Sequence, residues 1–188
     1  MKVAESGMPE EKLWETFFKP EDLLRKMGLS KKVKDVADFG SGYGTFTLPA
    51  AKIVSGTVYG IDLEKTMVDL LKDRARKAGL QNIKPILRDI DLEGSGLKDD
   101  SVDYVMLFNI LHGNHAENIL KEAHRILKSG GVAAVIHWKY DPTTPRGPPM
   151  EIRLRPEQIL QKAEMARFKL KKKLDLKPYH CGLIFIRE

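Results

Sequence analysis

The sequence contains a single cysteine, Cys181, and no cluster of cysteine and histidine residues with the spacing of a structural zinc site. One thiol excludes an intrachain disulfide and favours a reducing, cytoplasmic setting. Long apolar runs are also lacking: none approaches the length of a membrane-spanning helix, and residues 1–15 lack the apolar core of a signal peptide. We therefore expect a soluble, cytoplasmic protein without a membrane span or a metal site.

Charge of one sign is not concentrated anywhere in the chain. Its 32 Lys and Arg residues exceed its 26 Asp and Glu residues by a net charge of +6, but both signs are spread along the sequence. This is a mild basic bias, not a nucleic-acid-binding tail. With 188 residues, of which 42% are hydrophobic, the chain can bury one sizeable core, so we expect a single domain over residues 1–188.

The most informative stretch is residues 36–44, in which a short apolar strand runs into a loop with glycine at every second position, Gly40, Gly42 and Gly44. A helix is predicted to follow it. Such a loop lets backbone N–H groups approach a ligand closely, and the helix N-terminus favours an anionic group. A small-molecule pocket is indicated. The dinucleotide pattern G-x-G-x-x-G is weakened, though not excluded, because Thr45 stands where its third glycine would fall.

Two acids accompany this loop. Asp38, two residues before Gly40 at the end of the strand, is expected to sit beside a bound ligand rather than in the sheet interior, where it would favour an ammonium or a sulfonium. Asp62 ends the next predicted strand, at the point where a carboxylate can accept hydrogen bonds from both hydroxyls of a ribose. Asp62 as a cap for the helix over residues 64–78 is the alternative interpretation.

Strands and helices alternate along the rest of the chain. The predicted strands cover residues 34–39, 57–61, 83–87, 101–108, 132–138, 168–176 and 181–186. The predicted helices cover residues 45–54, 64–78, 116–127 and 156–166, with amphipathic helices over residues 10–27 forming a flap. This alternation predicts an α/β fold with a mostly parallel sheet and with ligands at the carboxyl ends of its strands.

With these elements placed, the sequence resembles the class I S-adenosylmethionine-dependent methyltransferases, in particular the compact kind related to the ubiquinone/menaquinone C-methyltransferase family. The matching pieces are Asp38-x-Gly40-x-Gly42-x-Gly44, Gly60-Ile61-Asp62, Arg88-Asp89, the strand leading to Asn109, and Glu122-x-x-Arg125-Ile126-Leu127-Lys128-x-Gly130-Gly131. The resemblance implies a single-domain, Rossmann-like sheet of seven strands in the order 3-2-1-4-5-7-6, with the last strand antiparallel and helices on both faces. Its parts would be an N-terminal flap (residues 1–30), a cofactor-binding core (31–140), and a substrate loop with the C-terminal strands (141–188).

The resemblance also implies the cofactor, S-adenosylmethionine, with S-adenosylhomocysteine as product and no metal. By motif position, Asp38, Gly40, Ser41 and Gly42 would hold the methionine end, Asp62 the ribose, Leu63 one side of the adenine, Asp89 and Ile90 the adenine edge, and the Asn109 backbone would face the sulfonium.

The chemistry expected is an in-line displacement, which requires mainly that the nucleophile and the methyl group be aligned and water removed. His112 is the first candidate for a base, followed by His137 and Tyr140, because an imidazole there is expected to titrate near the working pH. The alternative is that His112 caps the following helix or shapes the pocket.

Residues 141–149 contain four prolines and leave the fifth strand at its ligand-binding end, so we expect the segment of residues 141–155 to select the acceptor. Arg146 and Arg153 are predicted to bind an anionic group on it, with a solvent-exposed surface role as the alternative.

The acceptor itself is predicted to be a small molecule. The sequence Phe108-Asn109-Ile110-Leu111 replaces the Asn/Asp-Pro-Pro-Tyr of enzymes that methylate amino groups of adenine and glutamine, and arsenic methylation would need several thiols. Two alternatives stay open: a cofactor-binding regulatory partner without catalysis, and an RNA or protein methyltransferase, for which the lysines of residues 169–173 are the argument. A nucleic-acid partner is not indicated, and a monomer or homodimer is expected.

Overall fold

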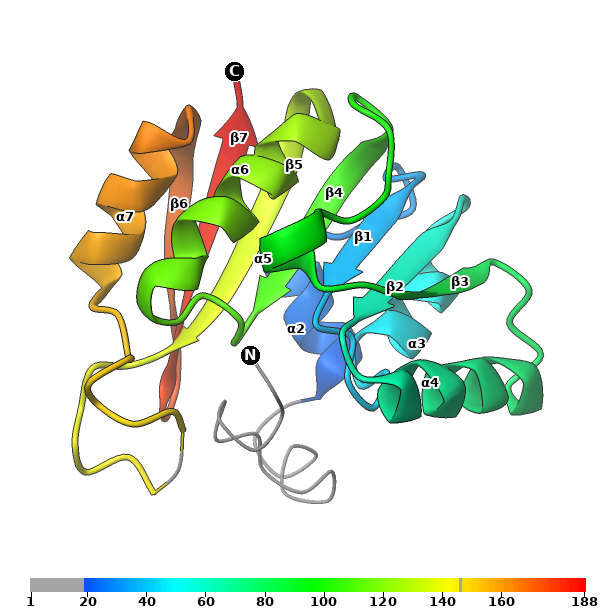
Figure 1. The fold of residues 1–188 in the computed structure, drawn as a ribbon, viewed down its shortest axis with the longest axis horizontal. Helices are drawn as coiled ribbons and strands as arrows, with labels where there is room; N and C mark the ends of the chain where they lie inside the picture. Colours follow the sequence, from blue (N-terminus) through cyan, green and yellow to red (C-terminus); the bar gives the residue numbers. More distant parts are fainter. Residues whose placement is uncertain (1–18, 146) are drawn as a thin grey trace.

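In the computed structural model, the protein is a twisted sheet with helices on both faces (Figure 1). The structure describes residues 19–145 and 147–188. The elements in chain order are α2 (Pro20–Lys26), β1 (Val36–Phe39), α3 (Thr47–Ile53), β2 (Val58–Asp62), α4 (Lys65–Lys77), β3 (Ile83–Leu87), α5 (Ile90–Glu93), β4 (Val102–Phe108), the 3₁₀ turn η1 (Gly113–His115), α6 (Ala116–Ile126), β5 (Leu127–Trp138), α7 (Pro156–Met165), β6 (Phe168–Leu176) and β7 (His180–Arg187).

The seven strands are arranged in the order β3-β2-β1-β4-β5-β7-β6. Strands β1 to β5 pair in parallel, and β7 runs antiparallel to both of its neighbours, β5 and β6. The strand order and the antiparallel last strand implied by the resemblance are confirmed. Because β1 to β5 run in one direction, the loops that follow them leave the sheet at the same edge.

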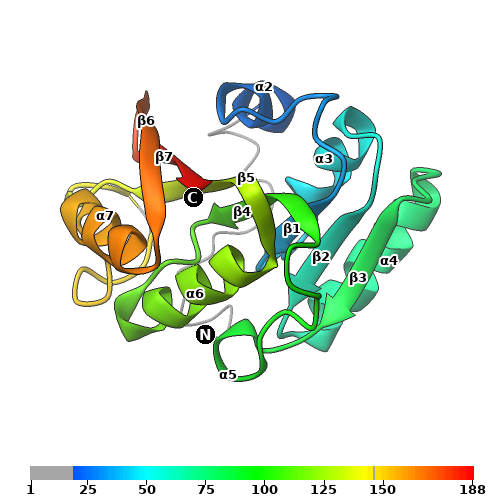
Figure 2. The same ribbon diagram turned by 90° about the horizontal axis from the view of Figure 1, so that it is seen from above.

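Alternate side chains along the strands point to opposite faces of the sheet and pack into two apolar layers. In β4, Tyr104 and Met106 face one layer and Val105 and Leu107 the other, and all four side chains are fully buried. Seen from above, α2, α3 and α4 cover one face of the sheet and α5, α6 and α7 the other (Figure 2). A strand that is buried on both faces must be apolar throughout, which explains the near-continuous apolar run of β4.

Helix α2 belongs to the predicted flap, whose residues 1–18 lie outside the described part of the chain. Leu23, Leu24 and Met27 bury its apolar side in the layer it shares with α3. The Tyr104 hydroxyl donates a hydrogen bond to the Met27 carbonyl at 2.9 Å, which ties the end of the helix to the sheet. The part of the flap that can be described is thus a fixed piece of the core.

The main differences from the prediction concern β5, α5 and β6. Strand β5 begins at Leu127, because Leu127 pairs with Val102 across an irregularity in β4, so residues 129–131 lie in the strand. The short helix α5 was not predicted. Strand β6 has the predicted bounds, and its alternation of apolar residues with lysines predicts half-burial. Leu170 is nevertheless 37% exposed, because β6 is an edge strand whose register shifts between Leu170 and Lys172.

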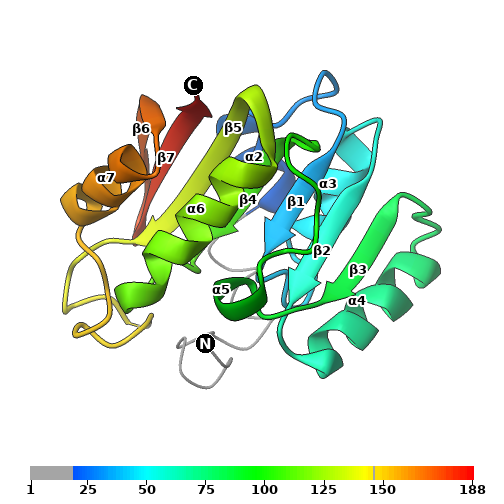
Figure 3. The same ribbon diagram turned by 45° about the horizontal axis from the view of Figure 1, so that its top comes forward.

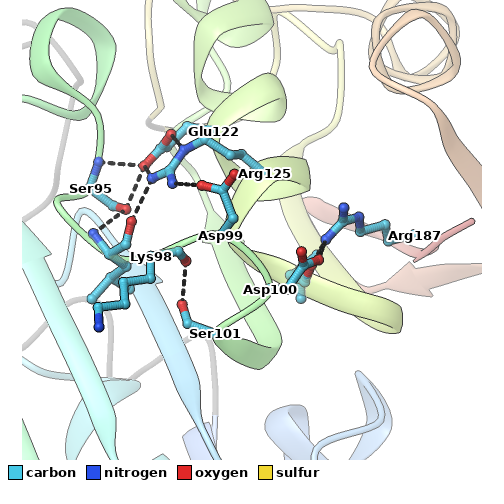
Figure 4. Close-up of polar contacts among 10 residues, drawn as sticks. Ser95, Lys98, Asp99, Asp100, Ser101, Glu122, Arg125 and Arg187 are labelled. Atoms are coloured by element: carbon cyan, nitrogen blue, oxygen red, sulfur yellow. Dashed lines mark hydrogen bonds and ion pairs between the residues drawn. The ribbon is translucent and has the colours of Figure 1, made fainter.

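A charged network joins α6 to the segment between α5 and β4 (Figure 4). The Glu122 carboxylate on α6 accepts hydrogen bonds from the Ser95 N–H at 2.6 Å and from the Arg125 guanidinium at 2.6 and 2.8 Å. Arg125 also donates to the Leu97 carbonyl and to Asp99. The segment between α5 and β4 is therefore held against α6, which gives the Glu122-x-x-Arg125 motif a structural role.

We expect Glu122→Gln to lower the free energy of unfolding by about 1–3 kcal/mol, because a charged acceptor of several hydrogen bonds is lost while Arg125 stays in place. Glu117→Gln, on the exposed side of the same helix, is the matched control and should change stability by less than about 0.5 kcal/mol. Urea unfolding of both variants measures the difference. Equal losses for the two would contradict the structural role of the network.

Candidate active site

The carboxyl ends of β1 to β5 lie together at one edge of the sheet (Figures 1 and 3). The structure brings to this edge the glycine loop, the acids that follow β2 and β3, and the polar residues that follow β4 or end β5. The loop after β1 is joined to β2 directly, because the N–H groups of Gly40 and Ser41 donate to the Ile61 carbonyl at 2.8 and 3.0 Å.

Backbone geometry explains the glycines of this loop. Gly40, Gly42 and Gly44 have φ angles of +73°, +49° and +81°, in the left-handed region that side chains disfavour. A Cβ atom on Gly40 would lie 3.0 Å from the Ile110 side chain, and one on Gly44 would lie 2.8 Å from the Leu71 side chain. The glycines therefore allow the loop to pass closely between β4's loop and α4.

Asp62 links the glycine loop to the entrance of α4. One of its carboxylate oxygens accepts from the Gly42 N–H at 2.8 Å, and the other accepts from the Glu64 N–H at 3.0 Å. The N-cap residue of α4 is Glu64, so Asp62 accepts a hydrogen bond next to the helix start without capping it. A carboxylate can accept about four hydrogen bonds, which leaves capacity for a ligand hydroxyl. Burial raises the pKa of Asp62.

Asp38 lies within the sheet, where it pairs with Gly60 and Met106, and it is 3% exposed. Asp38 therefore lies inside the sheet and not outside its interior as expected, although β1 ends at Phe39 as predicted. Its predicted place beside a ligand stays a prediction. The Thr47 hydroxyl donates to its carboxylate at 2.5 Å. Burial raises the pKa of Asp38 to about 7, against the lowering effect of this hydrogen bond. Thr47, a buried hydroxyl in the first turn of α3, was missed in the sequence because its partner lies nine residues away in another element.

The segment after β3 forms the short helix α5. The Asp89 side chain caps it, with one carboxylate oxygen accepting from the N–H groups of Asp91 and Leu92 at 3.1 and 3.3 Å. Both bonds reach the same oxygen, and the second carboxylate oxygen can accept a hydrogen bond from another partner. Ile90 is buried, and Leu63 is half-buried at the end of β2. This arrangement is compatible with the predicted contacts to an adenine edge, which stay predictions.

Asn109, immediately after β4, is one of the non-glycine residues with a positive φ, +54°. Its N–H donates to the Ile136 carbonyl at 2.7 Å. Both polar atoms of its side-chain amide are buried and have no hydrogen-bond partner among the described residues, as is also true of the Ser41 hydroxyl. Unpaired polar atoms in a strained turn are typical of a site that receives a polar ligand.

His112 and His137 lie close together, with ring centroids 5.4 Å apart, and both are buried. Burial lowers the pKa of His112 to about 4 and that of His137 to about 3. The expectation of an imidazole that titrates near the working pH is therefore wrong for both. His112 occupies the N-cap position of η1, but its side chain makes no capping hydrogen bond.

Arg153 holds the proline-containing loop in shape. Its guanidinium, which is buried, donates to the carbonyls of Pro148, Lys139 and Asp141 at 2.8 to 3.2 Å and to the Thr144 hydroxyl at 2.6 Å. An isolated antiparallel bridge joins His112 to Arg153. Arg153 thus connects the loop after β4 to the loop after β5.

The other predicted acceptor-site residues are less enclosed. Tyr140 is 38% exposed, and the Arg155 guanidinium lies over its ring at 4.3 Å from the centroid. Arg146 lies outside the described residues. Within residues 19–145 and 147–188, no group of three or more His, Cys, Asp or Glu side chains is arranged to hold a metal ion. No helix in the same part of the chain is long and apolar enough to cross a membrane.

We expect Asp38→Asn to stabilise the ligand-free protein at pH 8. A carboxyl group with a pKa of about 7 when folded and 3.8 as its ordinary value binds protons more readily in the folded state. Its contribution to stability is complete below about pH 4 and is lost as the pH rises towards 7. Asn cannot ionise, so the variant should lack this decline, which amounts to at most roughly 4 kcal/mol.

Urea unfolding of both proteins at pH 5 and pH 8 measures this effect. Asp69→Asn, on the exposed side of α4, is the control for losing one acidic residue. If wild type and Asp38→Asn lose the same stability between the two pH values, the carboxyl group of Asp38 is ionised throughout and its raised pKa is refuted.

Comparison with known proteins agrees with this geometry. The family model described as a methyltransferase domain matches residues 36–131, about half of the chain, from β1 into β5. This region holds the glycine loop, Asp62, Asp89 and Asn109.

Two curated relatives represent the similarity in sequence. The chain is 29% identical over 123 residues to demethylmenaquinone methyltransferase of Geobacillus stearothermophilus, a match that covers 62% of this chain and 50% of the relative. It is 34% identical over 108 residues to ribosomal protein L11 methyltransferase of Dictyoglomus thermophilum, covering 54% of this chain and 32% of the relative. The chain thus spans half or less of the length of these relatives.

The fold is also that of a solved structure, a SAM dependent methyltransferase from Aquifex aeolicus. The two superpose with a TM-score of 0.80 at 24% sequence identity, covering 92% of this chain and 91% of the other. With the family match over the cofactor side of the sheet and the predicted strand order both observed, the chain belongs to the class I S-adenosylmethionine-dependent methyltransferase family.

Proposed function

We propose that the protein transfers the methyl group of S-adenosylmethionine to a small-molecule acceptor. The observation that carries this proposal is the hydrogen bond from the Gly42 N–H to the Asp62 carboxylate, at 2.8 Å. It joins the loop suited to the methionine end of the cofactor to the acid suited to its ribose. The two parts of the proposed cofactor site are therefore aligned before the cofactor binds.

The proposed contacts follow the order of the strands. The methionine end would be held by Asp38, Gly40, Ser41 and Gly42, the ribose by Asp62, the adenine by Leu63, Asp89 and Ile90, and the sulfonium side would face Asn109. Two further observations support a polar ligand here: among the described residues, neither the Ser41 hydroxyl nor the Asn109 amide has a hydrogen-bond partner. The buried carboxylates of Asp38 and Asp62 favour a ligand that carries positive charge.

When bound, S-adenosylmethionine supplies a methyl group that its sulfonium has already activated. The chain then has to orient the acceptor and exclude water. With pKa values of about 4 and 3, His112 and His137 are neutral at pH 7 but are weak bases. We therefore propose that orientation, more than proton removal, is what these residues and Tyr140 contribute.

A small-molecule acceptor is supported by the name of the demethylmenaquinone methyltransferase relative. We propose that residues 141–149 shape its site and that Arg153 contributes by fixing this loop, since its guanidinium is directed at loop carbonyls. That Arg146 binds an anionic group of the acceptor stays a prediction. The cytoplasmic setting, the absence of a metal and the monomeric or dimeric state likewise stay predictions.

A macromolecular acceptor is the second candidate, because another relative is named a ribosomal protein L11 methyltransferase. The exposed lysines of β6 would supply charge for RNA. Binding to RNA would then weaken steeply with added salt. A cofactor-binding regulatory partner is the third reading and predicts cofactor binding without turnover.

We expect methyl transfer from isotopically labelled S-adenosylmethionine to a component of a pooled metabolite extract, with no transfer to pooled protein or RNA. Gly42→Val should abolish both binding and transfer, since a β-branched residue disfavours the φ of +49° at this position. Transfer to protein or RNA alone would select the second candidate. Cofactor binding without transfer to any pool would select the regulatory partner.

Asp62→Ala is expected to weaken binding of S-adenosylmethionine and S-adenosylhomocysteine equally, by about tenfold or more. A hydrogen bond to a charged acceptor contributes roughly 1.5–3 kcal/mol, and the two ligands share their ribose. Asp69→Ala on α4 is the control. Calorimetry on the folded variants decides the matter, and unchanged affinity in Asp62→Ala would remove Asp62 from the cofactor site.

A further inference from the structure

Two histidines at the carboxyl edge of the sheet share one environment. His112 comes from the loop after β4 and His137 from the end of β5, and their side chains are 1% and 0% exposed. Their ring centroids lie 5.4 Å apart, with the ring planes inclined at 43°. The two imidazoles therefore form a pair on neighbouring strands, next to Asn109.

Backbone carbonyls fix the tautomer of both rings. The Nε2 atom of His112 lies 2.8 Å from the Asn109 carbonyl oxygen, and that of His137 lies 3.2 Å from the Leu154 carbonyl oxygen. A carbonyl oxygen can only accept, so each Nε2 must carry the hydrogen. Because a neutral imidazole has a single N–H, the Nδ1 atom of each ring is an unprotonated acceptor.

These two Nδ1 atoms are left without a partner. Both are shielded from solvent, and neither has a hydrogen bond from any residue in the described part of the chain. A buried lone pair without a donor is unfavourable, and one in a ligand site is usually satisfied when the ligand binds. The pair thus offers two hydrogen-bond acceptors at the edge where the methyl acceptor must enter.

The charged groups around the pair also restrict the acceptor. Burial, the largest cause, and the nearby positive charge of Arg153 lower the pKa of both rings. The pKa of His180 is likewise lowered to about 3, so His180 adds no positive charge at pH 7. The imidazoles are therefore neutral, and the pair cannot balance a second positive charge. A protonated amine would therefore be repelled by Arg153 without gaining a counterion from the histidines.

We propose that His112 and His137 form one recognition site, in which their two Nδ1 atoms accept hydrogen bonds from O–H or N–H groups of an uncharged acceptor. This inference rests on the proposed methyl transfer and assigns the pair a role in specificity. The proposal requires residues 152–154 to stay in place, because the contact of Nε2 with the Leu154 carbonyl is what leaves the Nδ1 atom of His137 as the acceptor.

The tautomers can be tested without any acceptor. Long-range ¹H–¹⁵N correlation spectra of the full chain, labelled with ¹⁵N-histidine, should show His112 and His137 at pH 7 as neutral rings with hydrogen on Nε2 alone. Single His→Gln variants assign the signals. A ring that is charged at pH 7, or that carries its hydrogen on Nδ1, overturns the proposal whether or not the protein transfers methyl groups.

Recognition is tested with phenol and anisole, which differ in a single donor O–H group. In the presence of saturating S-adenosylhomocysteine, phenol should shift the Nδ1 signals of both histidines, and anisole should not. The signal of His124 is the internal control, because its Nε2 is also buried and unpaired but lies on α6. No response to phenol, or equal responses to both compounds, overturns the proposal.

Substitution supplies the matched comparison. A Gln side chain can donate to the same carbonyl as Nε2 but places no acceptor at the position of Nδ1. His112→Gln and His137→Gln should each weaken phenol binding about tenfold, whereas His124→Gln should change it by less than twofold. Equal phenol affinity in all three variants overturns the proposal. S-adenosylhomocysteine affinity, measured in the same samples, separates this result from failure of the proposed function, since loss of that binding in wild type refutes only the latter.

Discussion

The parallel pairing of β1 with β2 on one side and β4 on the other is the constraint on which the site depends. It sends the ends of three neighbouring strands to one edge, so residues far apart in the chain become neighbours there. The glycine loop is then tied to β2 by the hydrogen bonds of Gly40 and Ser41 to the Ile61 carbonyl. Because helices must cover both faces of such a sheet, the loops at its edge are left as the accessible place for a ligand.

The two edges of the sheet differ in whether their polar groups have hydrogen-bond partners. At the amino edge, Glu122, Arg125 and Ser95 satisfy one another, and the segment before β4 is held firmly. At the carboxyl edge, Ser41 and Asn109 have buried polar atoms without a partner in residues 19–145 and 147–188, and Asp38 is buried with a raised pKa. These features cost stability in the ligand-free protein. A ligand with complementary polar groups can form hydrogen bonds with these atoms. Groups that lower the stability of the ligand-free protein therefore favour binding, as is usual at functional sites.

Periodicity and glycine placement were sufficient to predict most of the fold. The bounds of β3 and β6 agree with the prediction, and the glycine loop, the mostly parallel sheet and the covering helices follow from local patterns in the sequence. The strand order came from the family resemblance and not from these patterns. The start of β5 could not be predicted, because the pairing of Leu127 with Val102 is a long-range contact and residues 129–131 look like a turn. The predicted burial of Leu170 was wrong, because an alternating pattern does not reveal that the strand lies at the edge of the sheet.

The positions of the site residues at the strand ends could be predicted from the sequence. Their burial, partners and pKa values could be predicted less well. Asp62 and Asn109 lie where the strand ends placed them. The pKa values of His112 and His137 and the partners of Asp38 depend on burial and on residues from other elements, such as Thr47, which no local pattern contains. Arg153 illustrates the same limit, since its carbonyl partners in the loop after β5 are set by tertiary structure.

Arg153 has a consequence for how this protein can diverge. In a fold whose cofactor side is fixed by one glycine loop, new acceptors arise by altering the loops after β4 and β5. Here a single guanidinium fastens one of these loops while its backbone bridges to the other. The two loops are therefore held as one unit, and a substitution that displaces one of them also disturbs the other.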